Sequence, residues 1–148
     1  MHRPGADAVR RTPARDPGVM TTADSAPPPD ARNQRLGAHG EDLAADYLRG
    51  RGCVLLARNW RDGRRGELDL IVRDGACVVA VEVKTRTGTG YGHPLEAITA
   101  RKAGRLRRLL LAWVRQQAVR PSHVRVDAIG ITLRPSERPR IDHLRGIG

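Results

Sequence analysis

The sequence predicts a mixed α/β protein whose elements follow one another in the order α-β-β-β-α-β-β. Two observations lead to this prediction. Apolar residues recur at helical spacing in two segments, about residues 35–50 and 95–118. Short apolar runs bounded by turn residues occupy much of the remaining chain, which is typical of strands. Such an order favours a mixed β-sheet flanked by helices.

Both predicted helices have an apolar side and a defined end. In the first helix, the residues at helical spacing are Leu36, Gly40, Leu43, Ala44, Tyr47 and Leu48. Gly50 and Gly52 end it, because glycine accepts the left-handed conformation that often follows a last helical turn. Pro121 closes the second helix. Its apolar side is longer and consists of Leu95, Ile98, Leu106, Leu109, Leu110, Trp113 and Val114.

Five strands are predicted, over residues 53–60, 66–73, 76–85, 124–133 and 138–144. The third is apolar on both faces over much of its length, so it should be central, and the last should be a short edge strand. Asp74 and Gly75 form a hairpin turn that makes the second and third strands antiparallel neighbours. The glycine-rich segment 87–92 is interpreted as a clamp or a dimer loop.

The chain has 148 residues, which suits one domain, but its first part differs in composition from the rest. Residues 1–34 hold six of the ten prolines and no Leu, Ile, Phe, Trp or Tyr. Such a segment buries too little apolar surface to offset the entropy of ordering it. We therefore expect a disordered tail over 1–34 and one folded domain over 35–148. Met20, inside this tail, is an alternative start.

The net charge of +11 favours a polyanionic partner such as nucleic acid, with an anionic membrane surface as the other candidate. No apolar run approaches the roughly 18 residues of a spanning helix, and no secretory signal is visible. Cys53 and Cys77 lie in apolar runs without metal-ligand spacing, so we expect reduced core thiols in a cytoplasmic protein. Aromatic residues make up 3% of the chain, which argues against a row of stacking rings for single strands.

The basic residues are unevenly divided between the two types. Of the 27, only Lys84 and Lys102 are lysines, and the other 25 are arginines. A codon bias explains the excess of arginine. A lysine that persists against such a bias suggests a use for a compact ammonium group with an adjustable pKa, which a planar guanidinium cannot replace.

Three carboxylates and one lysine fall on the two strands joined by the 74–75 turn. Glu67 and Asp69 are two residues apart on one strand, and Glu82 and Lys84 are two apart on the next. Side chains two apart on a strand share a face and lie about 7 Å from each other. The antiparallel pairing brings the carboxylates toward one another, as hard oxygen ligands suited to Mg²⁺ or Mn²⁺.

The same pattern is compatible with solvated charges on the exposed face of a hairpin, which contribute little to stability. Two features favour a functional site. Glu82 and Lys84 interrupt the most apolar strand of the chain, where a charge is costly unless it is paired or bound to a metal. Lys84 also stands where this chain otherwise uses arginine.

The order of Asp69 and Glu82-Val83-Lys84 resembles the (P)D…(D/E)xK signature of the restriction-endonuclease-like nucleases. Over nearly all of residues 33–144 the chain is similar to the YraN-type family of uncharacterised bacterial proteins, whose nearest well-understood relatives are the archaeal Holliday junction resolvases. The matching segments are GAHGE at 37–41, GELDLI at 66–71, VEVKTR at 81–86, and Lys102. The proline that precedes the aspartate in the signature is absent here, and Glu67 is an additional carboxylate.

The resemblance implies a restriction-endonuclease-like fold and distinct roles for the site residues. Asp69 and Glu82 would bind a divalent cation, Mg²⁺ or Mn²⁺, with help from the carbonyl group of Val83. Lys84 would orient or help to deprotonate the attacking water and stabilise the charge that develops on the phosphate.

Three further side chains near the motifs have alternative interpretations. The resemblance implies that Glu41 completes the metal ligands, and that Glu67 is either a ligand or a supporting group. From the residues alone, Glu41 is equally well explained as an acid that stabilises the first turn of a helix. His39 and His93 are more readily explained as solvated or locally hydrogen-bonded side chains than as groups that touch a substrate.

Basic residues outside this cluster are the candidates for phosphate contacts. On the second predicted helix, Arg101, Arg105 and Arg108 follow three- and four-residue spacing and form one stripe. A solvated helix face explains any one of them, but a stripe with few acids beside it favours contacts with the DNA backbone. The full set of candidates is Arg64, Arg65, Arg86, Arg101, Lys102, Arg105, Arg107, Arg108 and Arg115.

These features predict a metal-dependent endonuclease that hydrolyses phosphodiester bonds in duplex or branched DNA, the branched substrate being suggested by analogy to the resolvases. Two alternatives stay open: a non-catalytic nucleic-acid-binding module and a protein-interaction adaptor with the same fold. A homodimer, as in the resolvases, is also open. No membrane partner is expected.

Overall fold

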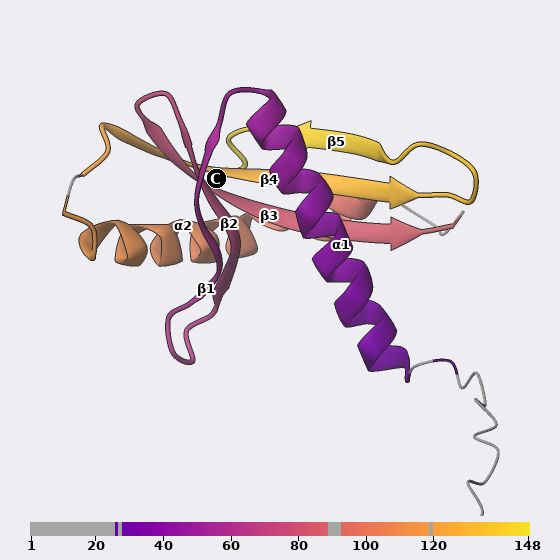
Figure 1. The fold of residues 1–148 in the computed structure, drawn as a ribbon. Helices are drawn as coiled ribbons and strands as arrows, with labels where there is room; N and C mark the ends of the chain where they lie inside the picture. Colours follow the sequence, from indigo (N-terminus) through magenta and orange to yellow (C-terminus); the bar gives the residue numbers. More distant parts are fainter. Residues whose placement is uncertain (1–25, 27, 89–92, 119) are drawn as a thin grey trace, which may run out of the picture.

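The computed structural model of this chain describes residue 26 and residues 28–88, 93–118 and 120–148. Within them, two α-helices enclose a five-stranded sheet (Figure 1). The elements are α1 (Pro29–Gly50), β1 (Val54–Arg61), β2 (Glu67–Asp74), β3 (Cys77–Thr87), the 3₁₀ helix η1 (Pro94–Ala97), α2 (Ala100–Arg115), β4 (His123–Leu133) and β5 (Arg140–Leu144). The predicted mixed α/β class and element order are confirmed.

The strands follow the order β1-β2-β3-β4-β5, with β3 in the centre and β5 at an edge, as predicted. β3 and β4 are parallel, and the other neighbouring strands are antiparallel. Parallel neighbours need a crossover connection, and here that connection carries η1 and α2. The predicted hairpin of β2 and β3 is also present, and Asp74 pairs with Cys77 at its closed end.

The two helices cover opposite faces of the sheet, and each builds its own core (Figure 1). Alternate residues of β3 serve the two cores, which explains why this strand is apolar on both faces. The core under α1 contains Ala44, Ala45, Leu48, Leu70, Val72, Val79, Val81, Ile129 and Ile131. The core under α2 contains Leu68, Ile71, Val78, Ala80, Leu106, Leu109, Leu110, Val114 and Val126.

The predicted start of the first helix was wrong, because α1 begins at Pro29 inside the expected tail. Proline suits a first helical turn, where its missing N–H is not needed, and Asp30 lies favourably at the positive end of the helix dipole. The prediction of disorder for residues 1–25 and 27 lies outside the described residues, as do Met20 and residues 89–92 of the glycine-rich loop.

The predicted helix over 95–118 is in fact two shorter elements. Pro94–Ala97 forms η1, and the backbone at Ile98 is extended. Thr99 then caps α2, because its hydroxyl oxygen accepts a hydrogen bond from the N–H of Lys102 at 3.1 Å. A threonine cap satisfies one of the free N–H groups of a first turn, so a separate helix begins at this point.

β2 separates from β3 at the acidic residues. Its pairing with β3 reaches Leu70, opposite Val81, and no further. Leu68 and Leu70 are two residues apart on β2, yet they belong to different cores. Beyond this pair, the N–H of Val83 donates to Oδ2 of Asp69 at 2.8 Å in place of a ladder hydrogen bond.

Cys53 and Cys77 are free, as expected, but they are only partly buried and pack against the edge of the core under α1. In the described part of the chain, no helix combines the length and the apolar character needed to cross a bilayer.

Candidate functional site

Asp69 and Glu82 form an acidic pair at the point where β2 and β3 separate. Glu82 is only 7% exposed and follows the α2-side core residues Val78 and Ala80 along β3. Burial and, second to it, the negative charge of Glu82 together raise the pKa of Asp69 to about 7, against the opposing hydrogen bond from the N–H of Val83. The pair therefore favours a proton or a cation between its carboxylates.

The two lysines of the chain both contact Glu82. Nζ of Lys102 lies 2.8 Å from Oε1 of Glu82, and Nζ of Lys84 lies 3.8 Å from the same atom. Lys84 comes from the same strand, whereas Lys102 comes from the first turn of α2. Burial acts to lower the pKa of Lys102, but the hydrogen bond to Glu82 and the negative charges of Glu82 and Asp69 together outweigh it, and the net pKa is raised. Lys102 is thus a charged partner for Glu82 at neutral pH.

Glu41 reaches the edge of the acidic pair from α1. Its charge contributes to the raised pKa of Asp69, and its Oε2 lies 3.5 Å from Nη2 of Arg58 on β1. Arg58 also binds Asp42 and donates to the carbonyl of Ala38 at 3.1 Å, so it ties α1 to the sheet beside Glu41. Arg58 was not expected at the site. The only sequence feature that could have indicated its role was an arginine inside a predicted strand.

Glu67 lies outside the acidic pair. Its carboxylate binds Arg61 across the β1–β2 ladder at 3.0 Å, and no contact among the described residues joins it to Asp69 or Glu82. Of the two histidines that lie near the motifs in the sequence, His39 is exposed on α1. His93 accepts a hydrogen bond from the N–H of Leu95 and pairs with Asp142, which are local structural contacts.

The basic candidates divide into one large group and three outliers. Arg64 is exposed on the β1–β2 loop. Arg86 lines a small hollow with His93, and Arg107 lines another with Pro121. The large group follows α2 and its neighbouring loop, where two adjoining hollows are lined by Arg65, Arg101, Lys102, Arg105, Arg108 and Arg115. Lys102 links this group to the acidic pair.

The donor set limits which metal the site can hold. Across the described ranges 28–88, 93–118 and 120–148, no group of three or more His, Cys, Asp or Glu side chains is arranged to hold a metal ion. The donors that do meet are the two carboxylates of Asp69 and Glu82. Mg²⁺ is commonly bound by one or two carboxylates, with waters and substrate phosphates as its other ligands. The pair therefore fits Mg²⁺ or Mn²⁺ better than a metal that needs a complete protein cage.

The fold and the site define a mixed α/β protein with an acidic pair of one buried and one partly buried carboxylate, two lysines at the buried one, and a basic helix beside them. The chain belongs to the family described as "Uncharacterised protein family UPF0102", the YraN-type family, whose profile matches residues 40–131. That range contains Glu41, Asp69, Glu82, Lys84 and Lys102.

Individual relatives agree with this assignment. A UPF0102 protein of Leifsonia xyli subsp. xyli is 53% identical over 117 residues, which cover 79% of this chain and 98% of the relative. A UPF0102 protein of Nocardia farcinica is 50% identical over 114 residues, with 77% and 89% covered. One from Streptomyces coelicolor is 45% identical over 113 residues, with 76% and 87% covered.

Proposed function

We propose that this protein is a metal-dependent nuclease that hydrolyses phosphodiester bonds in DNA. The observation that carries the proposal is the convergence of Lys84 and Lys102 on Glu82, beside Asp69. Phosphodiester hydrolysis needs ligands for a divalent cation and fixed positive charge near the phosphate. Both are supplied within one small site, and the arginines along α2 are suited to the DNA backbone.

Each residue has a defined task in this proposal. Asp69 and Glu82 hold Mg²⁺ or Mn²⁺, with Glu41 and the carbonyl of Val83 as the further ligands that the family resemblance suggests. The bound cation supplies a Lewis acid that polarises the phosphate and lowers the pKa of water. Lys84 orients the attacking water. Lys102, which neutralises Glu82 in this structure, turns to a phosphate oxygen when DNA is bound.

A non-catalytic DNA-binding module is the second candidate, and the short contact between Lys102 and Glu82 favours it. In this arrangement an ammonium group already neutralises the carboxylate that a cation would use. The acidic pair would then be a structural ion-pair cluster, and the basic residues along α2 would bind DNA without cutting it.

Calorimetry of Mg²⁺ and Mn²⁺ binding, combined with cleavage assays, distinguishes the two candidates. The assays use linear, nicked, flapped and four-way DNA. Glu82→Gln preserves the shape of the side chain but removes its charge, so we expect it to abolish metal binding and to lower cleavage by about 100-fold or more. Lys84→Ala should retain metal binding and lose cleavage to a similar extent, because the lysine acts on water and phosphate.

Glu137→Gln is the matched control, because Glu137 is an exposed residue of the β4–β5 turn. It should bind metal and cleave like the wild type. Metal binding that persists in Glu82→Gln would show that the site is assigned wrongly. Wild-type protein that binds metal and DNA but never cleaves would establish the non-catalytic module.

A further inference from the structure

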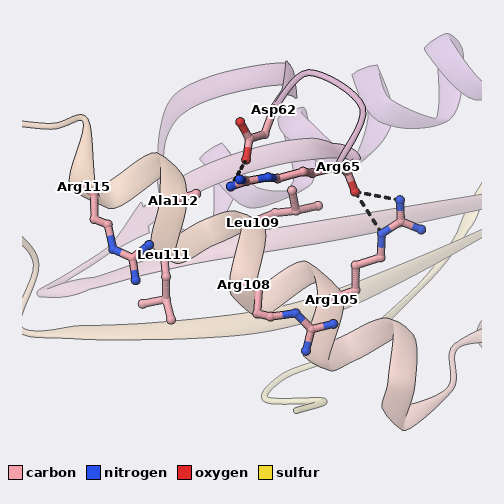
Figure 2. A pocket seen from close by; sticks show the side chains of 8 residues that line it. All are labelled: Asp62, Arg65, Arg105, Arg108, Leu109, Leu111, Ala112 and Arg115. Carbon is pink, nitrogen blue, oxygen red and sulfur yellow. Dashed lines mark hydrogen bonds and ion pairs between the residues drawn. The ribbon is translucent and has the colours of Figure 1, made fainter.

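A hollow of about 520 Å³ lies between the β1–β2 loop and α2 (Figure 2). We name it the α2 hollow. Its volume falls within the roughly 300–1,000 Å³ of small-molecule sites. Asp62 is the one acid among its lining residues. The apolar lining comes from Leu109, Leu111 and Ala112, and four arginines surround it: Arg65, Arg105, Arg108 and Arg115.

The hollow lies where one position in the arginine stripe is an alanine. Residues 101, 105, 108, 112 and 115 are spaced by four, three, four and three, so they share one face of α2. All of them are arginines except Ala112. Its methyl group leaves open the space that a long side chain would fill between Arg108 and Arg115 (Figure 2).

The far wall of the hollow is fixed in place by contacts between the loop and the helix. Nη2 and Nε of Arg105 donate to the carbonyl of Arg65 at 2.7 and 3.1 Å (Figure 2). Gly66 has φ +146°, a conformation that favours glycine, and a Cβ there would lie 3.0 Å from Cδ1 of Leu109, so the loop packs closely against α2. A preformed wall lowers the entropy cost of binding a ligand.

Two of the four arginines are available to a ligand. Arg65 lies 3.6 Å from Asp62, and Arg105 is used by the loop. No hydrogen bond or ion pair joins Arg108 or Arg115 to another residue of the described chain. Uncompensated guanidinium groups around an apolar floor suit a ligand that combines an anion with a flat apolar part.

The α2 hollow is connected to the acidic pair through Lys102. Arg105 and Arg108 also line the adjoining hollow, which contains Lys102, and Lys102 binds Glu82. At 1.5 Å per residue, Arg108 lies about 9 Å along the helix from Lys102. A DNA strand at the acidic pair would therefore meet the α2 hollow within a few nucleotides.

We infer that the α2 hollow binds one unpaired nucleotide of a DNA strand, a few nucleotides from the phosphate that lies at the acidic pair. This inference rests on the proposed function. In a continuous duplex the bases stay stacked inside, and the apolar floor would remain uncovered. The base of an unpaired nucleotide covers that floor, and arginine planes stack on bases and bind the adjoining phosphates. A single site of this kind needs no row of aromatic rings. The substrate class is then DNA with a flap, gap or junction rather than an intact duplex.

Binding measured by fluorescence anisotropy without metal tests this inference separately from cleavage. The probes are a blunt duplex, the same duplex with a short single-stranded extension, and that extension with abasic sites. We expect the extended duplex to bind about tenfold more tightly than the blunt one, since stacking of one base contributes on this scale. The duplex with the abasic extension should bind no more tightly than the blunt duplex. Equal affinities for the three probes would overturn the inference.

Ala112→Leu fills the hollow without changing the charge, so it should remove the preference for the extension and retain affinity for the blunt duplex. Circular dichroism checks that the variant folds. Arg108→Gln and Arg107→Gln form a second, matched test on the same helix, because they change the charge equally but Arg107 lines a different hollow. Only Arg108→Gln should reduce the preference for the extension. A preference unchanged in Arg108→Gln would overturn the inference even if Ala112→Leu does not fold.

The outcomes for the two proposals differ. A preference for unpaired nucleotides without cleavage in Mg²⁺ would reject the nuclease and keep the α2 hollow as a nucleotide site. Cleavage of blunt duplex without such a preference would support the nuclease and reject the α2 hollow as a nucleotide site. Binding of phosphatidylserine vesicles that depends on Arg108, in a protein that binds no DNA at low salt, would overturn both.

Discussion

At the scale of single residues, Asp69 and Glu82 show two ways of placing a carboxylate in an apolar region. Burial of a charge is costly unless it is paired. Glu82 meets this cost with two ammonium groups. Within the described residues no basic side chain forms an ion pair with Asp69, whose hydrogen-bond donor is the N–H of Val83. Its raised pKa follows from that difference.

We expect the protein to lose stability as pH rises from about 4 to about 8. Asp69 has a pKa of about 7 in the folded state and about 3.9 in an unfolded chain. Between these two pKa values, Asp69 is ionised in the unfolded chain but still protonated in the folded one. The unfolded state therefore binds fewer protons, and the free energy of unfolding falls with rising pH. Asp69→Asn should flatten this dependence and stabilise the protein by about 1–2 kcal/mol at pH 8, as measured by urea unfolding. Asp46→Asn, at an exposed position of α1, should retain the wild-type pH profile.

The sequence predicted the local part of the site and not the part that depends on tertiary structure. Glu82 and Lys84 share a face because strand geometry alone requires it. The contact between Lys102 and Glu82 depends on where the crossover places α2, which no spacing reveals. Glu67 was expected beside Asp69, but β2 leaves the ladder there and Arg61 lies across from Glu67.

At the scale of elements, the close crossing of α1 over β3 determines where Glu41 lies. The crossing point is Gly40, where a Cβ atom would overlap the hydroxyl of Thr85. That hydroxyl is buried, and it has no hydrogen-bond partner among the described residues. A glycine inside a helix is unfavourable by about 1 kcal/mol, so here the close approach of helix and strand offsets a local propensity cost.

Gly40→Ala should destabilise the protein by about 1–3 kcal/mol, because the added methyl group forces α1 away from β3. The displacement should also weaken metal binding by moving Glu41. Gly37→Ala is the control on the same helix, since a Cβ there meets nothing within 4 Å; it should stabilise the protein by up to about 1 kcal/mol. Thr85→Ala should be neutral or stabilising, because it removes an unpaired hydroxyl. Thermal unfolding of the three variants measures these effects, and a neutral Gly40→Ala would contradict the close crossing.

Element types were easier to predict than their ends. The five strands are all present within a few residues of their predicted bounds. The helix ends were missed where one capping residue outweighs the apolar pattern, as Thr99 does at the start of α2. The parallel pairing of β3 with β4 was not predicted, because apolar periodicity does not specify which strands become neighbours.

At the scale of the whole molecule, Asp127 joins four elements from within β4. It is 1% exposed and accepts hydrogen bonds from Arg125 at 2.7 and 2.9 Å, from His143 at 2.9 Å and from the N–H of Gly146 at 3.0 Å. His143 lies on β5 and contacts the hydroxyl of Tyr47 on α1, and Arg125 also binds Asp74 of β2. Burial acts to raise the pKa of Asp127, but the hydrogen bonds from His143, Arg125 and Gly146 lower it to about 2.

Asp127→Ala should destabilise the protein by about 3–5 kcal/mol, because it leaves buried donors and a charge without their partner. In the wild type, this contribution is complete above about pH 4 and is lost as pH falls toward the folded pKa of about 2. Asp142→Ala removes a more exposed carboxylate of β5 and should cost no more than about 1 kcal/mol. Urea unfolding at several pH values compares the variants; equal losses for both would contradict the role assigned to Asp127.

The crossover between β3 and β4 also has a kinetic consequence. Asp69 and Glu82 lie on a hairpin that closes through contacts near in sequence, whereas Lys102 arrives with a non-local connection, and such connections form slowly. A folding transition state with the hairpin formed and the crossover still open therefore holds both carboxylates beside Lys84 but without Lys102. Lys102→Ala should then leave the refolding rate nearly unchanged and accelerate unfolding, which stopped-flow denaturation measures.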